Sequence, residues 1–279
     1  MAGVAFLMAH SRIRHESTLR IGRVFDAVGI LEPMRTAFND VIDDLVAEYE
    51  RLSSILCALT DEQWELPSAA AGWTIADTVL HLAMSEEGVA TTLAMPEDSW
   101  HVRDHALDDA MDAQVRATTS TTGEILDRWQ NARHGSVRAL RVADPKVKVR
   151  WAAAPLRPQT LATTRMAEHW AHALDIVEPL GLTLPDEDRL RHIAWLGHST
   201  LPYAFRLHDQ EPADIFCTLT KPDGSVMHLG PPEAASTVTG PIGDFCRTGA
   251  QRLRPEHSSL QTRGPRADDA LRVLRNYAA

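Results

Sequence analysis

Residues 165–175 read RMAEHWAHALD, a helical pattern from which the rest of the chain can be interpreted. Glu168 and His172 are four residues apart, so on a helix their side chains project from one face about one turn apart. The same face continues to Arg165, three residues before Glu168, and to Asp175, three residues after His172. The residues between them are mostly apolar, which is unusual for a wholly exposed helix. The stretch therefore predicts a helix that carries an ionisable stripe within an apolar surface.

The stripe has two interpretations. A carboxylate and an imidazole at this spacing can bind one divalent cation, but the same pair also occurs as an ordinary surface pair on many helices. In the metal-binding interpretation, Arg165 orients Glu168. Asp175 then accepts the free N–H of His172, which fixes the tautomer of a ligating histidine. In the other interpretation, the four groups form a solvated face held by salt bridges.

A third candidate ligand, His81, lies on an earlier helix. Residues 74–77 (TIAD) have the pattern of a capping box, in which the threonine and the acidic side chain each accept a backbone N–H of the other. The apolar run that follows predicts a helix, and His81 stands within it. A histidine there is either a hydrogen-bonded core residue or, in a bundle whose side chains converge inside, a metal ligand. Two histidines and one carboxylate leave coordination positions open, as in catalytic metal sites.

Periodicity and caps predict that the fold is mainly α with an α+β C-terminal part. The predicted helices begin at Arg35 and Thr74 and cover 104–118, 121–142, 160–180 and 189–208. Beyond Pro212, alternation and a turn signal predict strands at 214–220 and 225–229, followed by helices at 241–252 and 267–277.

The predicted domains are a helical bundle over 34–182 and a small α/β domain over 183–279. Residues 1–33 are basic where the rest of the chain is acidic. We expect them to form a poorly ordered or non-native extension, with Met34 as the natural start. Deleting them should then leave thermal stability nearly unchanged.

Composition restricts the compartment and the partners. An apolar share of 44% supplies a sizeable core, and a net charge of −10 argues against a nucleic-acid groove. The three cysteines lack the spacing of a disulfide framework or a structural zinc site, and their apolar neighbours predict that all three are buried. No run approaches the ~20 apolar residues of a membrane span. We therefore expect a cytoplasmic protein without a membrane or nucleic-acid partner.

Two segments resemble ligand motifs of the mycothiol-dependent maleylpyruvate isomerase family, which has a DinB-like four-helix bundle. Residues 72–83 (GWTIADTVLHLA) look like the first motif, and residues 165–175 look like the second. The resemblance covers about residues 35–180. It implies His81, Glu168 and His172 as metal ligands, with zinc or another divalent metal as the cofactor and mycothiol as the co-substrate.

The C-terminal part resembles an actinobacterial branch of the same superfamily through residues 188–192 and 239–246. Its α/β region resembles the sterol-carrier-like C-terminal domain of the isomerases, from which an arginine helps to bind substrate or thiol. The resemblance makes Arg252 the candidate catalytic residue, with Arg247 and Arg254 as alternatives.

Together these features predict a zinc-dependent enzyme that activates a small thiol for transfer to, or isomerisation of, an electrophilic small molecule. Two alternatives are open. One is a non-catalytic small-molecule or lipid-binding protein with a structural metal. The other is a thiol-independent metal hydrolase, for which the sequence offers no dedicated general base beside the ligands.

Overall fold

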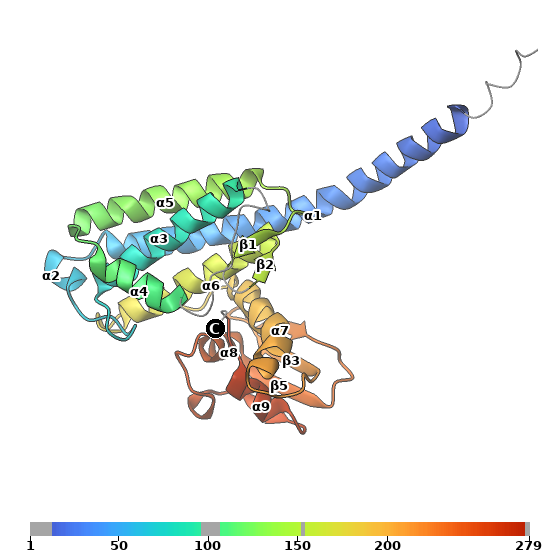
Figure 1. Ribbon diagram of the computed structural model, residues 1–279. Helices are drawn as coiled ribbons and strands as arrows, with labels where there is room; N and C mark the ends of the chain where they lie inside the picture. The colour runs from blue at the N-terminus through green and yellow to red at the C-terminus, as the bar shows by residue number, and fades with distance from the viewer. Residues whose placement is uncertain (1–12, 96–106, 152–153, 277–279) are drawn as a thin grey trace, which may run out of the picture. The chain divides into compact units, whose positions relative to one another are not determined.

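The computed structural model describes residues 13–95, 107–151 and 154–276 (Figure 1). Helix α1 (Ile13–Leu56) begins before the start predicted at Arg35. The chain divides into two compact units, Met1–Asp40 and Val41–Ala279, and every feature below belongs to the second. The division into extension, bundle and C-terminal domain stays a prediction, and residues 1–12 of the extension lie outside the described residues.

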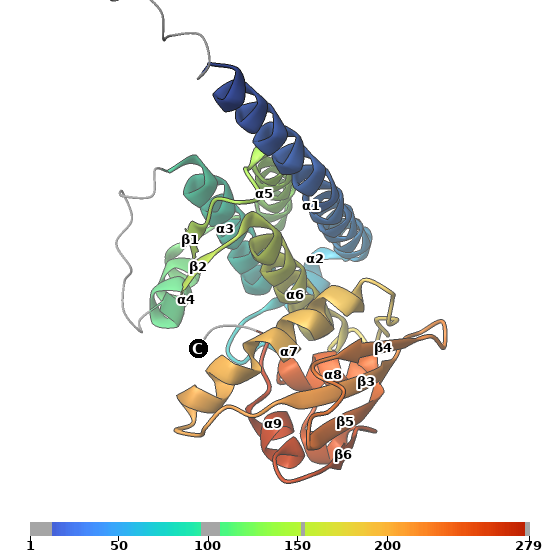
Figure 2. The same ribbon diagram turned by 90° about the vertical axis from the view of Figure 1, so that its right-hand side faces the viewer.

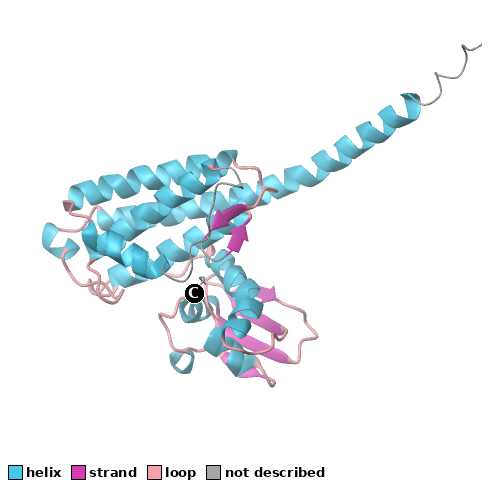
Figure 3. Ribbon diagram, viewed as in Figure 1, coloured by secondary structure: helices cyan, strands magenta, loops and turns pink. Residues whose placement is uncertain are grey.

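The helical part of the second unit is a bundle of long helices. Helices α3 (Ile75–Ala94), α5 (Thr122–Val142) and α6 (Pro158–Val177) pack together, α3 lying between the other two. Tyr49 of α1 joins them through ring contacts with Trp129 of α5 and His169 of α6. Figure 3 shows this part as almost wholly helical. Across the described ranges, no helix is long and apolar enough to cross a membrane.

Local signals begin and end these helices where the sequence predicts. At α3, Thr74 Oγ1 accepts the Asp77 N–H at 3.1 Å, and the Asp77 carboxylate accepts the Thr74 N–H at 2.9 Å. The same capping box starts α5 at Thr121. After α6, Gly181 has a φ of +64°, a left-handed conformation that favours glycine at a helix C-terminus.

Shorter elements connect the bundle helices. Helix α2 (Asp61–Trp64) was not predicted, although a third capping box starts it at Thr60. Helix α4 (Leu107–Ala117) matches the described part of the helix expected over 104–118. Strands β1 (Val149–Trp151) and β2 (Ala154–Leu156) form an antiparallel pair between α5 and α6.

The C-terminal part is a four-stranded sheet packed against helices. The strand order is β4-β3-β5-β6, and β3 (Ile215–Thr220) pairs in parallel with β5 (Ser236–Pro241). The edge strands β4 (Val226–Leu229) and β6 (Gln261–Arg263) pair antiparallel with their neighbours. Helices α7 (Leu190–Leu207), α8 (Ile242–Gly249) and α9 (Ala267–Val273) contact the sheet (Figure 2), and the 3-10 helix η2 (Pro255–His257) precedes β6. The mainly α chain with an α+β end is thus confirmed.

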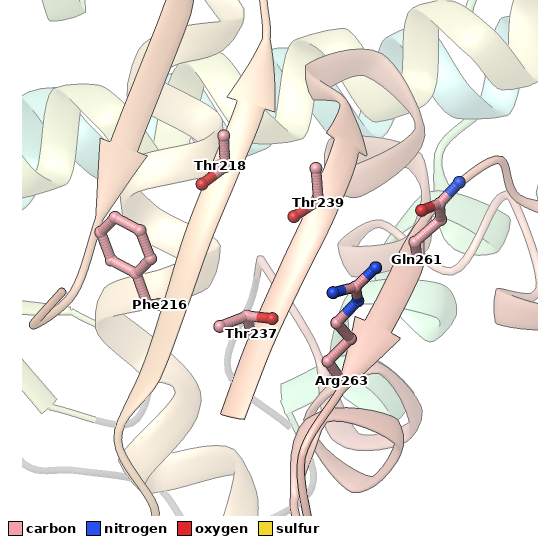
Figure 4. A pocket seen from close by; sticks show the side chains of 6 residues that line it. All are labelled: Phe216, Thr218, Thr237, Thr239, Gln261 and Arg263. Atoms are coloured by element: carbon pink, nitrogen blue, oxygen red, sulfur yellow. The ribbon is translucent and has the colours of Figure 1, made fainter. Parts of the chain in front are cut away.

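The two faces of the sheet differ in polarity. Alternate residues of β3 and β5 are buried toward the helices, among them Ile215, Cys217, Leu219 and Val238. The residues between them line an open hollow of about 290 Å³ on the other face (Figure 4): Phe216, Thr218, Thr237, Thr239, Gln261 and Arg263. The hollow combines hydroxyl, amide and guanidinium groups with the Phe216 ring, and its surface is about equally polar and apolar.

One prediction about the cysteines is wrong. Cys217 and Cys246 are buried as expected, but Cys57 is exposed. Because α1 ends at Leu56, Cys57 lies in the turn that follows rather than on the buried face of the helix.

Candidate metal centre

The fold brings the three predicted ligands together. His81 comes from α3, and Glu168 and His172 come from α6. His81 Nε2 lies 2.9 Å from Glu168 Oε1, and His172 Nε2 lies 3.5 Å from the same oxygen. One ligand atom from each residue lies within 4.8 Å of the others.

This donor set fits zinc. Zinc prefers imidazole nitrogen and carboxylate oxygen at ~2.0–2.1 Å, so neighbouring ligands of a tetrahedral ion lie about 3.3 Å apart. The two distances to Glu168 Oε1 lie on either side of that value, so small shifts of the side chains admit a common cation. Three protein ligands also leave a position for another molecule.

Asp175 holds His172 in the orientation that a ligand needs. Its Oδ2 lies 2.9 Å from His172 Nδ1, and because a carboxylate only accepts, Nδ1 is the donor. His172 Nε2 therefore faces Glu168. His81 has no such support, since its Nδ1 is buried without a hydrogen-bond partner among the described residues.

The charges of the site favour an ionised Glu168. Burial raises the pKa of this carboxyl, but hydrogen bonds from His172 and His81 and the charge of Arg165 hold it well below its usual range. For His172, burial lowers the pKa, yet the hydrogen bonds to Asp175 and Glu168 raise it to about 9. A cation that binds here therefore replaces a proton on His172.

Arg165 has a different partner from the one expected. Its Nε donates to Glu86 Oε1 of α3 at 2.8 Å rather than to Glu168, and both side chains of this pair are buried. An orienting role of Arg165 toward Glu168 stays a prediction. The charge of Arg165 acts on Glu168, because it lowers the pKa of that carboxyl.

Arg252 reaches the site through Asp175. Its Nε donates to Asp175 Oδ1 at 2.9 Å, and its Nη2 donates to Asp175 Oδ2 at 2.6 Å. The two competing arginines lie elsewhere: Arg247 pairs with Asp186, and Arg254 is exposed near Glu256.

Trp73, which lies within the first ligand motif, adds an aromatic wall to the site. Its ring centroid lies 5.0 Å from that of His81 and 6.2 Å from that of His172. The indole N–H donates to Asp112 of α4 at 2.8 Å, and Arg116 donates to the same carboxylate. Sequence reasoning missed Asp112, because it lies on a short polar helix without any pattern that indicates a partner.

His169 is a core residue and not part of the ligand set. Its side chain is fully buried. Its Nδ1 donates to Arg165 O, and its Nε2 accepts the Trp129 indole N–H at 3.1 Å. Burial lowers its pKa to about 4. His101 and His105, predicted to be structural, lie outside the described residues.

Comparisons with known proteins identify a family model and relatives that this chain resembles. The family described as "Mycothiol maleylpyruvate isomerase N-terminal domain" matches residues 45–177, which include all three ligands. Two uncharacterized proteins of Mycobacterium tuberculosis, MT0041 and Rv0036c, are each 30% identical over 243 residues, which is 85% of this chain and 95% of the relative.

Solved structures show the same fold. The crystal structure of the mycothiol-dependent maleylpyruvate isomerase has 14% identity and a TM-score of 0.54, over 84% of this chain and 96% of that chain. A point mutant of a mycothiol-dependent maleylpyruvate isomerase has 15% identity and a TM-score of 0.53, over 79% and 89%. Residues 45–177 therefore belong to the mycothiol maleylpyruvate isomerase N-terminal domain family, and the chain as a whole shares the fold of the isomerase structures.

Proposed function

We propose that this protein is a zinc-dependent enzyme that activates a mycothiol-type thiol for transfer to, or isomerisation of, an electrophilic small molecule. The observation that carries the proposal is the convergence of one ligand atom each from His81, Glu168 and His172 within 4.8 Å. The match of residues 45–177 to a family named after mycothiol supports a small thiol as co-substrate.

The residues around the cluster have distinct tasks in this proposal. Bound zinc would lower the pKa of a thiol at the open position, as it does for water. Glu168 supplies the negative charge of the ligand set, and Asp175 keeps His172 Nε2 directed at the site. Trp73 covers one side with an apolar ring and limits access of water. A reducing, cytoplasmic location is part of the proposal, because the cysteines are free thiols.

The two alternatives have less support. A lipid-binding protein needs a deep apolar pocket, whereas the hollow on the sheet is open and only half apolar. A hydrolase needs a free general base near the ligands. Asp175 is bound to His172 and Arg252, and Glu86 is bound to Arg165, so neither carboxylate is available for that task.

Metal analysis of the purified protein tests the proposal. We expect about one zinc per wild-type chain and none in His172→Ala, because two remaining ligands hold zinc poorly. His192→Ala is a matched control, since this histidine contacts Asp44 instead of the cluster, and it should retain the metal. A wild-type protein that neither contains zinc nor takes it up would refute the proposal.

Thiol activation needs its own readout. In the cobalt-substituted protein, addition of a small thiol should produce a sulfur-to-cobalt charge-transfer band, and His172→Ala should lack it. Turnover is then screened with a panel of electrophiles in the presence and absence of the thiol. A metal-loaded protein that shows no band and no thiol-dependent turnover would contradict thiol activation while leaving the metal site intact.

A further inference from the structure

We propose that Arg252 is a positioning residue for the metal ligand His172, so that the segment after α8 completes the metal centre of the helical bundle. The inference rests on the proposed function, because it requires a cation at His81, Glu168 and His172. It assigns Arg252 a role in metal affinity in place of direct contact with substrate.

A continuous chain of hydrogen bonds supports this role. Asp175 is almost fully buried, with 1% of its side chain exposed. Arg252 donates to both of its oxygens, at 2.9 and 2.6 Å, in a two-point contact that fixes the plane of the carboxylate. The second oxygen also accepts His172 Nδ1 at 2.9 Å. The orientation of the imidazole therefore depends on a carboxylate that Arg252 holds in place.

The backbone around Arg252 is shaped to direct it back toward α6. Helix α8 ends at Gly249, and Gln251 has a φ of +59°, a left-handed conformation that side chains rarely adopt. The Arg252 N–H then donates to Arg247 O at 2.9 Å, and its Nη1 donates to Ala250 O at 2.7 Å. Three nitrogens of the guanidinium are thus held at once. The Gln251 N–H also donates to Thr248 O, so the end of α8 is a Schellman motif, which fixes the direction of the backbone at Arg252.

Removing Arg252 would leave the Asp175 carboxylate with the His172 hydrogen bond but without its two-point contact. The carboxylate and the imidazole could then rotate together, and His172 Nε2 would no longer be fixed toward the site. Loss of an outer partner of a metal ligand typically costs about 10–100-fold in metal affinity. Arg252 lies one step further out, so we expect about 10-fold.

Zinc affinity of the full chain is the test, measured by competition with a chromophoric chelator. We expect Arg252→Met to bind zinc about 10-fold more weakly than the wild type, and Arg252→Lys, which restores one charged donor, to lie between them. Arg247→Met is the matched control. It removes an equivalent two-point contact, with Asp186, from the same helix end, and should leave zinc affinity within about 2-fold.

A double variant shows whether Arg252 acts through Asp175. In an Asp175→Asn background, Arg252→Met should cause little further loss of zinc affinity, because its target is already altered. Circular dichroism and thermal melting of the metal-free proteins check that each variant is folded, and Arg252→Lys keeps the test informative if Arg252→Met unfolds.

The possible outcomes are distinct. Wild-type zinc affinity in both Arg252 variants would overturn the inference and leave the proposed function standing. An equal loss in the wild-type and Asp175→Asn backgrounds would also overturn it, since Arg252 would then act by another route. A wild-type chain that binds no zinc would overturn the proposed function and this inference together.

Discussion

Replacing Arg165 with methionine should destabilise the bundle strongly, because it leaves a buried charge without its partner. Glu86 and Arg165 have 0% and 4% of their side chains exposed, and they meet at 2.8 Å. Removing one partner of such a buried pair costs about 3–5 kcal/mol. Methionine retains most of the aliphatic volume of arginine, so the loss comes mainly from the charge on Glu86.

The loss should also depend on pH. Burial raises the pKa of Glu86, and the charge of Arg165 is the main effect that brings it below the usual value of 4.5. Without Arg165 we expect the folded-state pKa to rise above the unfolded one. The contribution of Glu86 to the stability of the variant is then largest below about pH 4.5 and falls as pH rises, because the unfolded chain releases this proton more readily.

Urea denaturation followed by circular dichroism gives the free energy of unfolding for this comparison. Arg128→Met is the matched control, because Arg128 makes a two-point contact with Glu87, the residue after Glu86, at 2.7 and 2.8 Å. That pair is partly exposed, with 33% and 44% of the side chains accessible, so its loss should cost no more than about 1 kcal/mol.

A double variant isolates the charge. Glu86→Leu combined with Arg165→Met removes both charges and should recover most of the stability lost in the single variant. The reasoning fails if Arg165→Met costs no more than Arg128→Met, or if the double variant is as unstable as Arg165→Met alone.

Three further predictions concern the cysteines and His169. A thiol reagent should modify only the exposed Cys57 in the native chain and all three cysteines after unfolding. Cys217 and Cys246 are buried, and burial raises the pKa of Cys217 to about 12 and that of Cys246 well above its usual value. Rapid modification of all three cysteines in the native chain would contradict the packing. Stability should decrease by roughly 3 kcal/mol between pH 6.5 and 4 through His169 alone, because the unfolded chain takes up a proton there while burial holds the folded-state pKa at about 4. His169→Gln should flatten that part of the pH profile, and an unchanged profile would refute the assignment. Trp129→Phe, which leaves His169 Nε2 without its donor, should cost about 1–3 kcal/mol in the same denaturation assay.

Signals within a few residues of one another determined most of the helices. The capping boxes at Thr74 and Thr121 place the starts of α3 and α5, and Gly181 follows α6 in the left-handed conformation. These features depend only on backbone groups close in the chain, so no knowledge of the fold is needed to find them. The strands β5 and β6 were missed because they are short and mostly polar, and only pairing with neighbours makes them strands.

The ligand set was predictable in part for the same reason. Helical spacing alone puts Glu168 and His172 on one face, and the tautomer contact from Asp175 follows from the same spacing. His81 could be joined to them only through the assumption of a bundle or the family resemblance, because nothing local relates α3 to α6. The structure supplies that relation as a distance of 2.9 Å.

Contacts between distant elements were decided by the tertiary structure alone. Spacing on α6 indicates the direction in which Arg165 and His169 point, but it does not indicate what lies there. The packing of α3 against α6 brings Arg165 within hydrogen-bonding distance of Glu86. The packing of α5 does the same for Trp129 and His169. Arg252 meets Asp175 because a left-handed turn at Gln251 directs it back. The physical reason is that a helix determines its own geometry through hydrogen bonds a few residues apart, whereas the partner of a buried charge depends on how separate elements pack.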